Sequence, residues 1–224
     1  MFRELLDAWR SKDILNQMYD ELIQMLDDAA WMFRNVCDVL FDDKAAAELG
    51  DDLYQHDIRV NQTERRIRKQ LVQHLTIAPS GAHVPPCLIL MSVVKDAERI
   101  GDYCKNLFEI ERLNRGPLTG NSYVGVFRTM AEDILKTFEK TRKAFADADS
   151  DLGHEIIEHQ IELNHQCDEL IERLANDNVP CRQAVAYALA ARHLKRVSAH
   201  LGNIASSVVM PIHKIDYFDE KWHR

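Results

Sequence analysis

Apolar residues recur at helical spacing along almost the whole chain, and the polar–apolar alternation typical of strands is nearly absent. The segment from residue 13 to residue 41 shows this spacing clearly, since its apolar side chains repeat every three or four positions. Those side chains are Leu15, Met18, Leu22, Met25, Ala29, Met32, Val36 and Val39. Helices with one apolar stripe bury it against other helices, so the sequence predicts an all-α fold.

Prolines and glycines divide the chain into six helical segments. We expect helices over residues 13–41, 44–75 and 86–113, and then over 124–145, 151–175 and from about 181 to 210. The clearest linker lies between the third and fourth segments, where Gly116-Pro117 and Gly120-Asn121 favour turns. The sequence therefore predicts two tandem three-helix bundles, one in residues 1–117 and the other in residues 118–224.

The two halves of the chain repeat one pattern. Residues 56–62 (HDIRVNQ) match residues 159–165 (HQIELNH) in the second helix of each half. Residues 97–103 (AERIGDY) match residues 194–200 (LKRVSAH) in the third helix, and an asparagine follows three residues later in both. An internal repeat of about a hundred residues implies two copies of one structural unit.

Charge and cysteine content exclude several classes of protein. The formal net charge of -8 opposes binding to nucleic acid or to an anionic membrane. The five cysteines are odd in number and form no CxxC pair, which is typical of idle thiols in a reducing compartment. The start of the chain lacks a leader pattern, and the most apolar stretch, residues 87–94, is too short to span a bilayer. We expect a cytoplasmic protein.

Two pairs of oxygen-bearing side chains stand four residues apart on neighbouring helices. Glu98 and Asp102 project from one face of the third helix, and Asp57 and Asn61 from one face of the second. If these helices pack antiparallel, the pairs face each other and offer three carboxylates and an amide oxygen to a cation. The alternative is a solvated helix face on which Glu98 forms an ion pair with a neighbour such as Arg99.

Other patterns suggest weaker sites. The run from His154 to His159 places its histidines five apart, which does not match the four-residue spacing of a zinc-protease helix. Glu162 and His165 form an ExxH unit, but a ferritin-like metal enzyme needs a second such unit, and we find none. The last helix is locally basic, and Arg192, Lys195 and Arg196 on it are candidates for docking an acidic partner surface. A solvated face is the alternative.

The third-helix motif resembles a known family. Residues 97–103, followed by Asn106, are similar to the PhoU signature LERIGDH with a later asparagine, and residues 57–64 resemble the family's second-helix pattern. The two-copy, six-helix layout is also similar over nearly the whole chain. The resemblance implies a cytoplasmic regulator that restrains phosphate uptake, and it implies carboxylate motifs that bind iron or zinc clusters in several members. It also implies two kinds of partner: a phosphate transporter (its ATPase subunit or a sodium–phosphate symporter) and a sensor histidine kinase.

The motifs of this chain depart from the family pattern. In the first copy three of four motif carboxylates remain, because Asn61 stands where a carboxylate is expected. In the second copy none remains, since the motif positions hold Gln160, Asn164, Lys195 and Ala199. A protonated lysine offers a metal no lone pair. We therefore expect one metal site at most, for iron or zinc, at Asp57, Asn61, Glu98 and Asp102.

The sequence thus favours a non-enzymatic regulator that acts by protein–protein contact. Two alternatives stay open: a ferritin-like, carboxylate-bridged metal enzyme, and a helical scaffold without metal. A homodimer is also compatible with the sequence.

Overall fold

The computed structural model describes residues 3, 13–42, 46–77, 81–119 and 122–217. Its long helices are α2 (Asp13–Phe41), α3 (Ala46–Ile77), α4 (Val84–Asn114), α5 (Val124–Asp147), α6 (Ser150–Asn176) and α7 (Cys181–Val209). Two short 3-10 helices, η1 (Gly81–His83) and η2 (Ile212–Lys214), precede α4 and follow α7. No strand occurs in these residues. The all-α prediction is confirmed, and the expected helix ends agree with the observed ones to within a few residues.

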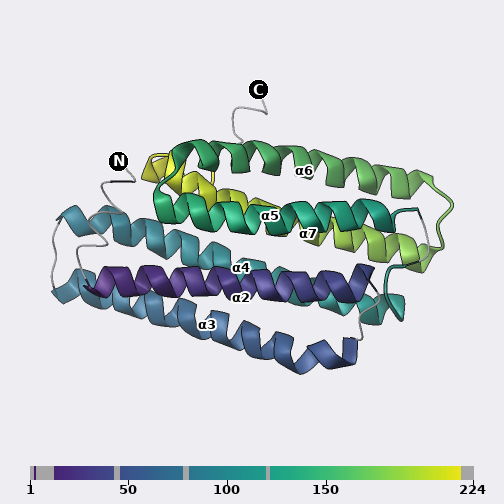
Figure 1. The fold of residues 1–224 in the computed structure, drawn as a ribbon, viewed down its shortest axis with the longest axis horizontal. Coiled ribbons are helices and arrows are strands. Elements are labelled where there is room, and N and C mark those ends of the chain that lie inside the picture. The colour runs from purple at the N-terminus through teal and green to yellow at the C-terminus, as the bar shows by residue number, and fades with distance from the viewer. Residues whose placement is uncertain (1–2, 4–12, 43–45, 78–80, 120–121, 218–224) are drawn as a thin grey trace.

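The six long helices form two three-helix bundles that lie side by side (Figure 1). Helices α2, α3 and α4 pack together in the first bundle, and α5, α6 and α7 in the second. The bundles meet through their first and third helices, because α2 contacts α5 and α4 contacts α7. Helices α3 and α6 lie on the two outer sides (Figure 1). The predicted tandem bundles are confirmed; the boundary between residues 117 and 118 stays a prediction.

The apolar stripes of the helices form the core. All eight side chains predicted for the stripe of α2 are buried, including Met18, Leu22 and Val36, which are fully enclosed. Four of the five cysteines are buried and Cys181 is exposed, and none of the five forms a disulfide. None of the described helices has the length and apolar composition needed to cross a bilayer.

Aromatic rings fill the contact between α2 and α5. The ring pairs are Tyr19 with Phe145 (centroids 5.5 Å apart), Phe33 with Phe138 (5.8 Å) and Phe41 with Phe127 (5.4 Å). Phe127 also stacks on Tyr187 of α7, 5.2 Å away, so this row of rings reaches a third helix. Buried aromatic pairs contribute both their large apolar area and a favourable ring geometry. The two bundles therefore share one continuous core.

The contact between α4 and α7 follows the internal repeat. Asp96 and Tyr103 of α4 correspond to His193 and His200 of α7. Asp96 contacts His200 (2.7 Å between Oδ1 and Nδ1), and the corresponding pair, Tyr103 and His193, also meets, with ring centroids 5.8 Å apart. Tyr103 stacks on its own counterpart His200 as well, at 5.6 Å. The two third helices thus pack about an approximate twofold axis that passes near Tyr103 and His200.

The linker between the copies is tied to the first bundle. Arg115 (φ 64°) and Gly116 (φ 137°) end α4 in the left-handed region, and the N–H of Gly116 donates to the carbonyl of Glu111 at 2.9 Å. Two residues later, the N–H of Leu118 donates to the carbonyl of Leu40 at 2.7 Å. The buried side chain of Leu118 fixes the chain there before it enters the second copy.

We predict that Phe41→Ala lowers the free energy of unfolding by about 3–5 kcal/mol, because it removes a fully buried ring between the bundles. Urea unfolding followed by circular dichroism measures the change. Leu88→Ala is the control, since Leu88 is 52% exposed, and it should change the free energy by about 0.5 kcal/mol or less. Equal losses in the two variants would contradict a shared aromatic core.

Candidate functional site

The predicted oxygen ligands lie along the seam between α3 and α4. Asp57 and Asn61 are on α3, and the amide nitrogen of Asn61 donates to Oδ2 of Asp57 at 3.2 Å. Gly101 of α4 lies opposite this carboxylate, since a Cβ on Gly101 would be in ordinary van der Waals contact with Oδ1 of Asp57, at 3.8 Å. Glu98 and Asp102 flank Gly101 on α4. The structure thus brings both predicted pairs to one seam.

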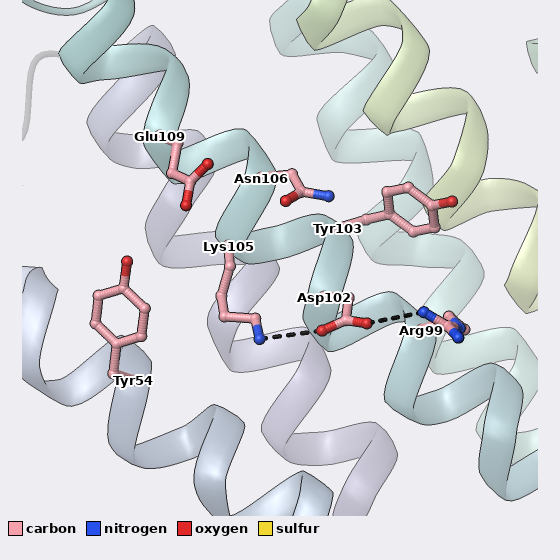
Figure 2. A pocket seen from close by; sticks show the side chains of 7 residues that line it. All are labelled: Tyr54, Arg99, Asp102, Tyr103, Lys105, Asn106 and Glu109. Carbon is pink, nitrogen blue, oxygen red and sulfur yellow. Dashed lines mark hydrogen bonds and ion pairs between the residues drawn. The ribbon is translucent and has the colours of Figure 1, made fainter.

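A lysine that the sequence analysis did not single out joins the two helices. The ammonium of Lys105 lies 3.0 Å from Oδ1 of Asp57 and 3.0 Å from Oδ1 of Asp102. Its side chain is only 22% exposed. Figure 2 shows Lys105 reaching Asp102 along α4. A signal was present in the sequence, because Lys105 follows Asp102 by three residues and such pairs meet on a helix.

Asp102 lies between two cations. Besides Lys105, Arg99 contacts it, with Nη1 of Arg99 3.1 Å from Oδ2 of Asp102 (Figure 2). The same guanidinium lies 3.7 Å from Glu98. Burial raises the pKa of Glu98, and the negative charges of Asp102 and Glu64 raise this pKa further. Three carboxylates of the seam, Asp57, Glu98 and Asp102, thus lie at contact distance from two cations, Lys105 and Arg99.

The charge state of Lys105 follows from its contacts. Burial by itself lowers the pKa of an ammonium, but the hydrogen bonds to Asp57 and Asp102, together with their charges, outweigh burial here. The net result is a Lys105 pKa above its ordinary value. The side chain therefore stays protonated at neutral pH and supplies a permanent positive charge between the two carboxylates.

An open polar pocket adjoins the seam. Its volume is about 390 Å³. The lining residues are Tyr54 of α3 and Arg99, Asp102, Tyr103, Lys105, Asn106 and Glu109 of α4 (Figure 2). Asn106 of the sequence motif thus lies on the wall of this pocket (Figure 2). The side chain of Tyr103 extends from α4 toward α7 (Figure 2). The pocket is lined by both basic and acidic side chains, so it suits a polar binding partner.

The donor set does not fit a metal ion as these side chains are placed. The oxygens of Asp57 and Asp102 that would bind a cation contact an ammonium, and Asn61 turns its nitrogen toward Asp57. Among the described residues, no three histidine, cysteine or acidic side chains gather as a metal site. Iron or zinc at Asp57, Asn61, Glu98 and Asp102 stays a prediction, which elemental analysis measures directly.

The second copy has a neutral version of the same seam. Gln160 of α6, the counterpart of Asp57, is buried against Gly202 of α7, the counterpart of Lys105. A Cβ on Gly202 would lie 3.0 Å from Cγ of Gln160, so the missing side chain leaves room for the glutamine. Lys195, the counterpart of Glu98, forms an ion pair with Asp168, with Nζ 2.7 Å and 2.6 Å from its two oxygens.

The predicted docking residues differ in their exposure and in their ion pairs. Arg192 and Arg196 are exposed and stand four residues apart on one face of α7. Lys195, predicted with them, is held by Asp168 of α6. The accessible positive charge of this face is therefore carried by the two arginines.

The sequence did not predict a cluster of polar side chains between α4 of the first copy and α7 of the second. The carboxylate of buried Asp96 in α4 accepts from the amide of Asn203 at 2.9 Å and also contacts His200, both of α7. Asp216, which follows η2, is close enough for its charge to interact with them. Burial, and then repulsion by Asp96, raise the pKa of Asp216 to about 6, although His200 and Lys95 act in the opposite direction.

The chain is similar to several known proteins. The PhoU domain family model matches it twice, over residues 15–110 and 127–208. A relative from Xylella fastidiosa, named phosphate-specific transport system accessory protein PhoU homolog, is 23% identical over 88% of this chain and 82% of its own length. PhoU homolog 1 from Thermotoga maritima is 23% identical over 72% of each chain. The crystal structure of PhoU from Pseudomonas aeruginosa has the same fold, with a TM-score of 0.77, 23% identity, and coverage of 87% of this chain and 95% of that one.

We predict a pH-dependent gain in stability from Asp216→Asn. The pKa of Asp216 is about 6 in the folded state and about 3.8 ordinarily, so between these values the folded chain holds a proton that the unfolded chain releases. Stability from this group is therefore lost as pH rises from about 4 to about 6. Asparagine tolerates the left-handed backbone at this position (φ 73°).

The stability of the variant relative to the native protein should therefore increase from pH 4.5 to pH 7.5, measured by urea unfolding across that range. Asp20→Asn on an exposed face of α2 is the control. A stability difference between Asp216→Asn and the native chain that does not change with pH would show that Asp216 lacks the raised pKa.

Proposed function

The chain belongs to the PhoU family, and on that basis we propose that it regulates phosphate uptake as an accessory protein of a phosphate transport system. The observation that carries this proposal is the match of the family model to both copies. The names of the relatives from Xylella and Thermotoga, which describe accessory proteins of phosphate-specific transport, point the same way.

The proposed mode of action is contact with other proteins in the cytoplasm. The partners we propose are a phosphate transporter, through its ATPase subunit or as a sodium–phosphate symporter, and a phosphate-sensing histidine kinase. The two copies support a link between unlike partners, because they expose different chemistry. The first copy presents the charged seam with its open pocket, and the second presents the exposed arginines Arg192 and Arg196.

A ferritin-like enzyme finds less support in the side-chain positions. Such enzymes project their glutamates and ExxH units into the bundle interior. Here Glu162 and His165 are exposed on the outer helix α6, and Glu162 accepts from the amide of Gln166 at 3.3 Å. The ExxH unit thus lies on a solvated face of α6.

We predict that deletion of the gene alters both phosphate uptake and the phosphate dependence of gene expression. Uptake of radiolabelled phosphate and a phosphate-responsive reporter measure the two effects, and plasmid-borne native protein should restore both. A deletion strain that keeps normal uptake and normal reporter control at low and high phosphate would instead favour a metal-free scaffold.

The homodimer that is compatible with the sequence is tested separately, by light scattering of the purified protein.

We predict that Arg192→Glu with Arg196→Glu weakens binding to one partner by roughly tenfold or more, since reversing two exposed charges turns attraction to an acidic surface into repulsion. Co-purification with the transporter subunit and with the kinase, each at two salt concentrations, measures the loss. Arg65→Glu with Lys69→Glu is the matched control, because these residues are also exposed and four apart, but on α3. Equal binding by the two double variants would contradict a docking face on α7.

A further inference from the structure

We propose that Lys105 is a built-in cation of the α3–α4 seam, which takes the place that a metal ion would otherwise hold, so that the native protein works without a metal there. The proposal concerns the chemistry of the seam in the purified protein, and it does not depend on the regulatory function proposed above.

The position of the ammonium carries this inference. Lys105 lies 3.0 Å from one oxygen of Asp57 and 3.0 Å from one oxygen of Asp102, so it bridges carboxylates from two different helices. A metal ion bound at this seam would bridge the same two carboxylates. The ammonium donates to Oδ2 of Asp57 at 3.0 Å and also hydrogen-bonds Asp102. While protonated it has no lone pair with which to join a metal's ligand shell.

The positive charges already in the seam also repel a metal ion. Asp57, Glu98 and Asp102 supply three negative charges, and Lys105 and Arg99 already supply two positive ones at contact distances. A divalent ion would add two more within a few ångströms of an ammonium that burial partly shields from water. Metal binding to the native seam would therefore require Lys105 to leave both of its partners.

The second copy provides an independent observation. There both carboxylate positions of the third helix are lost, to Lys195 and Ala199, and the position of Asp57 holds Gln160. The lysine is lost with them, because Gly202 occupies the position of Lys105 and the neutral glutamine packs into the space. A lysine at the position of Lys105 thus occurs in the copy that has the carboxylates, and the copy that lacks them has a glycine there. This pattern is expected if Lys105 is their counter-ion.

The first experiment uses the native protein. It is purified from medium supplemented with iron, zinc and manganese, and its metal content is measured by elemental mass spectrometry beside a Glu98→Ala/Asp102→Ala double variant. We expect far less than one metal per chain in the native protein, and no difference between the two. About one metal per chain that the double variant loses would overturn the proposal.

The second experiment removes the ammonium. Lys105→Met keeps the length of the apolar stem but leaves the carboxylates without their counter-ion, so we expect Mn²⁺ to bind at least about tenfold more tightly than to the native protein. Calorimetric titration with Mn²⁺ measures the affinity. Lys136→Met is the matched control, because Lys136 forms an exposed pair with Asp133 on α5, 2.8 Å apart, and its loss should leave Mn²⁺ binding unchanged.

Lys105→Arg and a melting-temperature series complete the test. The arginine keeps the positive charge and should bind Mn²⁺ no better than the native protein. A ligand that binds only the folded state raises the melting temperature, so Mn²⁺ should stabilise Lys105→Met even if that variant is less stable than the native chain. Failure of Mn²⁺ to stabilise Lys105→Met, or equal stabilisation of all four proteins, would overturn the proposal.

Discussion

The packing of the two third helices, α4 and α7, is the contact on which the rest of the molecule depends. Each of these helices belongs to its own bundle and also forms the boundary with the other, so neither bundle is enclosed without it. Polar side chains take part in this contact, since buried Asp96 receives hydrogen bonds from across the boundary. A buried carboxylate left without its hydrogen-bond partners destabilises the folded state. The relative position of the bundles is therefore set by polar partners as well as by the aromatic row between α2 and α5.

Much of the fold could be predicted from the sequence because its signals are local. The apolar stripe of α2 and the breaks at Pro85-Pro86 and Gly116-Pro117 define helices without reference to the rest of the chain. The contact of Asp96 with His200 could not be predicted in this way, because 104 residues separate them and neither lies in a motif with a fixed partner. The same holds for the aromatic row, whose rings look like ordinary core positions until α2 and α5 are placed together.

In the α3–α4 seam, the placement of the carboxylates could be predicted from the sequence, and the position of Lys105 could not. Spacing placed Asp57, Glu98 and Asp102 on facing surfaces, and the structure agrees on their placement. What spacing could not resolve is which cation lies among them, because a long lysine side chain can point to solvent or reach across to the next helix. The outcome depends on the neighbouring helix, which offers Lys105 a second carboxylate. The three-dimensional arrangement places the ammonium of Lys105 among them, 3.0 Å from carboxylates of both helices.

The approximate twofold axis near Tyr103 and His200 has a consequence for how such a chain can change over evolutionary time. Two identical chains joined about a true twofold axis must accept every substitution twice, once on each side of the axis. A tandem chain accepts it once, so residues that meet at the axis can become unlike, as the phenol and the imidazole have here. Covalent fusion thus frees one half to keep its charged seam while the other becomes neutral. A tandem chain can in this way present two chemically different faces where a symmetric pair would present two identical ones.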